Sequence, residues 1–72
     1  MKPEHYELFQ RYLATWGGDM GVNTYSRKPR VHLIVGDNRS ACRGQVLTFD
    51  RVYEPDTDAC ALCVAKARRG IG

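Results

Sequence analysis

Five side chains of this 72-residue chain are ligands that soft or borderline metal ions accept: His5, His32, Cys42, Cys60 and Cys63. The last four form an ordered set, with nine, seventeen and two residues between successive members. Structural zinc takes four tetrahedral ligands, and three cysteines with one histidine supply them with no open coordination position. The spacing therefore predicts one structural Zn²⁺ ion bound by His32, Cys42, Cys60 and Cys63.

The pair Cys60 and Cys63 falls where a helix is expected to begin. Residues 56–58, Asp-Thr-Asp, offer N-cap oxygens for a helix over about 60–69, and Gly70 is suited to end it. Both sulfurs would then lie near unsatisfied backbone N–H groups and the positive end of the helix dipole. This environment favours thiolate, which is the form that binds a metal ion.

His32 and Cys42 fall on a predicted β-hairpin, because the β-branched run 31–35 is followed by turn residues and a return segment. Side chains alternate between the two faces of a strand, so these two ligands must share a face. A two-residue loop at 37–38 would send them to opposite faces. A three-residue loop at 36–38 would pair them directly. We predict the three-residue loop or an equivalent β-bulge.

An amphipathic helix is predicted over residues 3–16, where Tyr6, Phe9, Leu13 and Trp16 recur at spacings of three, four and three. We expect this stripe to pack on the sheet. The alternative is an exposed face that binds a partner, anchored on residues such as Trp16 or Tyr12, because Trp and Tyr are common interface anchors.

These elements predict an α+β fold in a single domain over residues 1–72. It consists of a helix within 1–17, a loop over 18–30 and a zinc knuckle over 31–70. The knuckle holds a small antiparallel hairpin or three-stranded sheet, with a candidate third strand at 45–53, and a short C-terminal helix. A chain this short is rarely stable from its core alone, so the metal ion would link the hairpin to that helix.

The motif VH…AC…CALC resembles the small Cys3His zinc-binding proteins of actinobacteria and their phages, and more generally treble-clef and zinc-ribbon knuckles. The resemblance covers roughly residues 30–70. This chain differs from many knuckles, which have a second Cys-x-x-Cys, because nine residues separate its His32 and Cys42. The resemblance implies a zinc site in a small binding module.

Other interpretations of these residues are retained. The three cysteines could be reduced thiols of the core, an iron–sulfur cluster could take the Cys3His set, and the Cys-x-x-Cys could be redox-active. His5 is expected to be a solvated or capping residue, and His32 could be an ordinary strand residue.

The formal net charge is +3, and the basic excess lies after residue 26. Nucleic-acid or acidic-partner contacts are candidates for eight basic residues: Arg27, Lys28, Arg30, Arg39, Arg43, Lys66, Arg68 and Arg69. Basic residues in the last turn of a helix also simply complement its dipole. No signal segment or membrane span is apparent, so we expect a cytoplasmic protein, where thiols stay reduced.

Two functions follow from these features. The first is a non-enzymatic zinc-binding module that docks on a protein, with host transcription or defence machinery as the partner if the phage resemblance holds. The second is direct binding of DNA or RNA. The chain has no Ser-His-Asp context, phosphate-binding glycine loop or zinc-deaminase motif. Four protein ligands also leave no position for an activated water, so we predict that it is not an enzyme.

Overall fold

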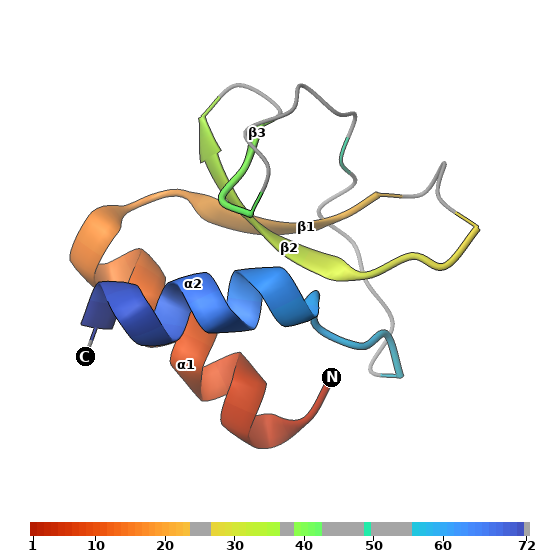
Figure 1. The fold of residues 1–72 in the computed structure, drawn as a ribbon, viewed down its shortest axis with the longest axis horizontal. Coiled ribbons are helices and arrows are strands. Elements are labelled where there is room, and N and C mark those ends of the chain that lie inside the picture. The colour runs from red at the N-terminus through yellow and green to blue at the C-terminus, as the bar shows by residue number, and fades with distance from the viewer. Residues whose placement is uncertain (24–26, 37–38, 43–48, 50–55, 72) are drawn as a thin grey trace.

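The computed structural model describes residues 1–23, 27–36, 39–42, 49 and 56–71. In chain order these form α1 (Pro3–Trp16), β1 (Asp19–Val22), β2 (Val31–Gly36), β3 (Arg39–Ser40) and α2 (Ala61–Ile71). The strands make one antiparallel sheet in the order β1-β2-β3, and Figure 1 shows both helices on the same side of it. The predicted α+β class is confirmed. Within the described residues, no helix is both long and apolar enough to cross a membrane.

Helix α1 has the predicted bounds. It begins at Pro3, whose ring suits a first helical turn, and it ends before Gly17. Gly17 has a φ of 82°, and its N–H donates to the Leu13 carbonyl at 2.8 Å. A glycine adopts this left-handed φ without steric penalty, so the end of α1 is set by sequence.

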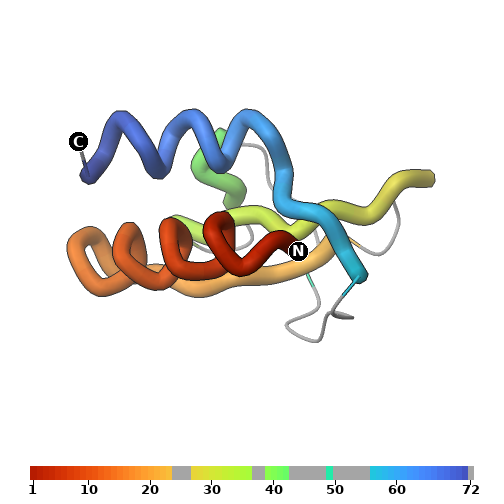
Figure 2. Tube along the Cα trace, turned by 90° about the horizontal axis from the view of Figure 1, so that it is seen from below, coloured from red at the N-terminus to blue at the C-terminus, as the bar shows by residue number. Residues whose placement is uncertain are grey.

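The buried face of α1 differs from the predicted stripe. Phe9 and Tyr12 are buried, whereas Tyr6 is 44% exposed and Trp16 is 64% exposed. Helix α1 packs mainly against α2, and Figure 2 shows the two helices side by side. Because α2 covers the side of α1 that carries Tyr12, the buried face of α1 includes Tyr12. Trp16 lies in the last turn of α1, beside the end of α2.

Strand β1 lies within residues 18–30, which were predicted as a loop, so that prediction is wrong for Asp19–Val22. Residues Asp19 to Val22 pair with β2 in a register from Asp19↔Ile34 to Val22↔Val31. Consecutive residues Met20, Gly21 and Val22 are all buried, so β1 lacks the alternation that marks a half-buried strand. The strand predicted at 45–53 lies outside the described residues except for Phe49, which belongs to no strand.

Strands β2 and β3 form a hairpin with the irregularity that the ligands require. Ile34 pairs with Ser40 and Gly36 pairs with Arg39, so the register shifts between the two pairs. This shift is the kind of irregularity that a β-bulge produces, which was the predicted alternative to a three-residue loop. Extending the Ile34–Ser40 register by two residues on each strand brings His32 opposite Cys42.

The core lies between the sheet and the two helices. Its fully buried members are Phe9 from α1, Val31 and Leu33 from β2, and Cys63 and Ala67 from α2. Two of the three cysteines are thus part of the core cluster, because Cys60 is only 9% exposed. Gly70, predicted to end the C-terminal helix, lies inside α2, which continues to Ile71.

Candidate metal centre

The structure brings the four predicted ligands together. The ligand atoms of His32, Cys42, Cys60 and Cys63 all lie within 4.8 Å of one another. His32 Nδ1 is 3.6 Å from the sulfur of Cys42 and 3.6 Å from that of Cys63. The sulfurs of Cys42 and Cys60 are 3.9 Å apart. These residues come from β2, from the turn after β3 and from the start of α2, so one ion would join all three parts.

These distances fit a tetrahedral ion. Ligands at metal–sulfur and metal–nitrogen bond lengths of about 2.3 and 2.05 Å have sulfurs about 3.8 Å apart, and sulfur about 3.6 Å from nitrogen. The observed separations of 3.9 and 3.6 Å agree with these values. All three cysteines are free, and sulfurs 3.9 Å apart are well beyond the length of a disulfide bond. The four side chains can therefore hold a single metal ion.

A backbone pairing positions the start of α2 beside β2. Val31 N–H donates to the Asp58 carbonyl at 2.9 Å, and Cys60 N–H donates to the Val31 carbonyl at 2.9 Å. This parallel bridge is centred on Val31 and Ala59. Because both backbone groups of Val31 bond to the segment before α2, the parallel register places Cys60 opposite His32.

The predicted N-cap interactions at α2 are replaced by other contacts. The Asp58 side chain forms an exposed ion pair with Arg30 at 3.2 Å, and the Asp58 carbonyl accepts from Val31. Helix α2 begins at Ala61, so Cys60 is the residue before its first turn, and the Cys60 carbonyl accepts from Val64 N–H at 2.9 Å. The reason for the change is that the 58–60 backbone pairs with β2 and leaves the cap position to Cys60.

Cys63 is the most deeply enclosed ligand, with no exposed surface. Its sulfur accepts the Leu33 N–H at 3.5 Å, which favours thiolate. Burial nevertheless raises the pKa of the Cys63 thiol far above its ordinary value, and charge on Cys60 and Cys42 raises it further. Burial thus outweighs the predicted effect of the helix start on this residue. Three neighbouring thiolates need a cation among them, which a divalent metal ion supplies.

Two neighbours of the ligands were missed in the sequence analysis. Ser40 is 1% exposed, and its Oγ is 3.4 Å from the sulfur of Cys42. The ring of Phe49 lies 5.7 Å from the His32 ring, centroid to centroid, at an angle of 57°. The spacing of two between Ser40 and Cys42 was a usable signal for Ser40, since residues i and i+2 share a face of a strand. No local pattern indicated Phe49.

His5 is not part of the cluster. It is half-buried near the start of α1 and lines a surface hollow with Arg30, Asp58 and Ala59 among others. His5 was expected to be a solvated or capping residue, and the structure shows it half-buried beside this hollow.

The predicted basic residues are divided among several places. Arg27, Lys28 and Arg39 are exposed near the ends of β2 and β3, and Arg43 lies outside the described residues. Arg30 pairs with Asp58. On α2, Arg68 lines a hollow with Glu4 and Glu7, whereas Lys66 and Arg69 line a different hollow with Tyr12 and Trp16.

The two predicted aromatic anchors also differ from each other. Tyr12 is 7% exposed and belongs to the core cluster, so the prediction of Tyr12 as an exposed anchor for a partner is wrong. It is buried because α2 packs over that side of α1. Trp16 is 64% exposed and is available to a partner.

Comparison of the chain with models of protein families, with curated proteins and with solved structures gives no match.

Proposed function

We propose that this chain is a non-enzymatic, zinc-binding module that docks on a protein partner. The observation that carries the proposal is the convergence of His32 Nδ1 and three cysteine sulfurs within 4.8 Å, with three of their six separations at the values of a tetrahedral ion. Three thiolates and one imidazole are the donor set of structural zinc sites. The ion would connect β2, the turn after β3 and α2, and would stabilise a fold whose own core is small.

The closed ligand set supports a structural role for the ion. Catalytic zinc keeps one position for water or substrate, whereas here four protein ligands fill a tetrahedron. Cys63 is fully buried and Cys60 nearly so, which limits the access of a substrate to the ion. We therefore assign no reaction to this centre.

The distribution of charge supports a protein as the partner. Nucleic-acid binding depends on many cations arranged along a phosphate backbone. Here Arg68 lies with two glutamates and Arg30 is paired with Asp58, while the other described candidates lie before β2, on β3 and on α2. Three free cysteines suit a reducing compartment such as the cytoplasm. The resemblance of the Cys3His motif to phage proteins makes host transcription or defence machinery the first class of partner to examine.

Native mass spectrometry of protein purified without added metal tests the zinc assignment, together with elemental analysis. The expected result is one zinc ion per chain, lost on acidification together with the cooperative melting transition. The iron content of the same sample distinguishes zinc from an iron–sulfur cluster. A metal-free protein with an unchanged melting transition would contradict the proposal and would make the cysteines ordinary core residues.

A further inference from the structure

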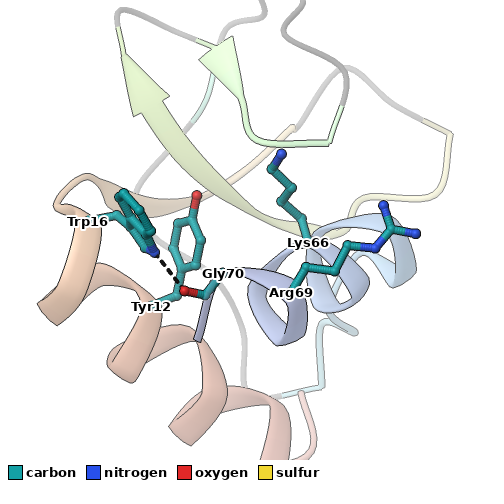
Figure 3. A pocket seen from close by; sticks show the side chains of 5 residues that line it. All are labelled: Tyr12, Trp16, Lys66, Arg69 and Gly70. Atoms are coloured by element: carbon teal, nitrogen blue, oxygen red, sulfur yellow. Dashed lines mark hydrogen bonds between the residues drawn. The ribbon is translucent and has the colours of Figure 1, made fainter. Parts of the chain in front are cut away.

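The C-terminal ends of α1 and α2 lie together and form a surface hollow of about 310 Å³. It is lined by Tyr12, Trp16, Lys66, Arg69 and Gly70. Figure 3 shows the two aromatic rings of α1 on one side and Lys66 and Arg69 of α2 on the other, with the Arg69 side chain extending away from the rings. This volume is near the lower limit of about 300 Å³ for ligand pockets, so it suits one or two side chains of a partner. None of these residues belongs to the Cys/His cluster.

Trp16 is both exposed and fixed in place. Its indole N–H donates to the Gly70 carbonyl at 3.0 Å, although 64% of the residue is exposed. The Tyr12 ring lies behind it, with centroids 6.5 Å apart. Since the only polar atom of the indole is used within the chain, its exposed surface is apolar. A fixed ring also loses little conformational freedom when a partner binds, which favours binding.

Gly70 allows the two helix ends to approach closely. A Cβ at this position would lie 2.8 Å from Tyr12 Cε2 and 3.2 Å from Trp16 Nε1. Any other residue would therefore displace one of the rings that line the hollow. This close approach explains why a helix residue with low propensity occurs inside α2.

Lys66 and Arg69 give the hollow a positive rim. They are exposed, and among the described residues neither has an acidic side chain within 4.0 Å. Dipole complementation accounts for Arg68 and Arg69 in the last turn of α2, but Lys66 lies before that turn. The rim therefore attracts an acidic ligand.

We infer that this hollow binds a short acidic peptide segment of the partner protein, with one apolar side chain against Trp16 and carboxylates beside Lys66 and Arg69. The inference rests on the proposed docking function and assigns it a site. A peptide fits better than a nucleic-acid strand because the hollow is small and because the neighbouring side of α2, at Arg68, lies with Glu4 and Glu7. Those carboxylates would repel an extended phosphate backbone.

The single tryptophan of the chain makes the site directly observable, since Trp16 fluorescence comes from the hollow itself. The probes are three heptapeptides with Asp or Glu at six positions and Leu, Met or Phe at the centre. The comparison probes are a peptide with alanine at the centre and an oligothymidine. We expect at least one of the three acidic apolar peptides to produce a saturable change, with tighter binding than either comparison probe.

Charge reversal provides the matched variants. The double variant Lys66→Glu with Arg69→Glu should weaken binding of that peptide by at least about tenfold, while Arg68→Glu, a change on another face of α2, should leave it within about twofold. Trp16→Ala, followed by anisotropy of a labelled peptide, should weaken binding about thirtyfold. If none of the three peptides binds, if oligothymidine binds more tightly, or if Arg68→Glu has the same effect as the double variant, the inference is wrong.

The zinc content of every variant is measured in the same samples. Protein that holds zinc but binds no peptide overturns only this inference, because the hollow and the metal centre share no residue. Protein that lacks zinc but binds the peptide overturns only the zinc assignment.

Discussion

Replacing Cys63 with serine tests whether the metal ion holds the fold together. The sulfur of Cys63 is fully buried, lies 3.6 Å from His32 Nδ1 and accepts the Leu33 N–H. A serine hydroxyl is nearly isosteric and can still accept that N–H, so the main loss is one ligand of the proposed metal ion. The substitution therefore isolates the contribution of the metal from that of packing.

The size of the effect follows from the number of ligands. Structural zinc contributes roughly 10–16 kcal/mol in small finger domains, so an equal share for one of four ligands is roughly 2.5–4 kcal/mol. A core of this size supplies roughly 3–5 kcal/mol. In a domain of 60–100 residues each 1 kcal/mol shifts the melting temperature by roughly 4–8 °C, so Cys63→Ser should lower it by roughly 10–30 °C.

Thermal melting followed by circular dichroism, with the zinc content of each sample, measures this change. Leu62→Ser is the matched control, because Leu62 is the adjacent residue of α2 and is 53% exposed. Its melting temperature should stay within about 3 °C of the original. A Cys63→Ser protein that melts with the Leu62→Ser control would refute the reasoning, whether it keeps the ion on three ligands or loses it.

Three further changes test other parts of the structure. Gly18→Ala should lower the free energy of unfolding in urea by roughly 1–3 kcal/mol or more, because Gly18 has a φ of 109° and a Cβ would collide with the Ile34 carbonyl oxygen. An unchanged unfolding midpoint would contradict this geometry. Asp58→Asn should lower the free energy of unfolding by less than about 1 kcal/mol in the same assay, since the ion pair of Asp58 with Arg30 is exposed. A larger loss would contradict the small contribution expected of an exposed ion pair. Lowering the pH to about 5 should release the metal, because burial raises the pKa of the Cys63 thiol and protons then compete with the ion for its sulfur; metal retained at that pH in a chelator titration would contradict this.

The helices were predictable because their signals are local. Pro3, the aromatic period and Gly17 all lie within α1 or next to it, and α2 was predicted to within one residue at its start. The spacing of His32 and Cys42 also required a bulge or a three-residue loop, because only these put both side chains on one face. The irregularity between Ile34 and Gly36 satisfies that requirement.

The features that were not predicted depend on partners distant in sequence. Strand β1 is four residues long and includes Gly21, so only its pairing with β2 reveals it. The exposure of Trp16 depends on where α2 ends, and the burial of Tyr12 depends on α2 packing against α1. Neither the exposure of Trp16 nor the burial of Tyr12 can be predicted from the periodicity of α1 alone.

The pairing of Val31 with Asp58 and Cys60 bears on the order in which the protein folds. Only two residues separate Cys60 and Cys63, so this pair could take up the proposed metal ion before any tertiary structure exists. Bringing Cys42 to them closes a loop of seventeen intervening residues, at an entropic cost of about 2.5 kcal/mol plus a constant. Because β2 bonds to the backbone beside Cys60, recruitment of His32 to the ion and addition of the 58–60 segment to β2 are the same step. Metal capture by the local pair would therefore come first, and closure of the hairpin onto α2 would set the rate of folding.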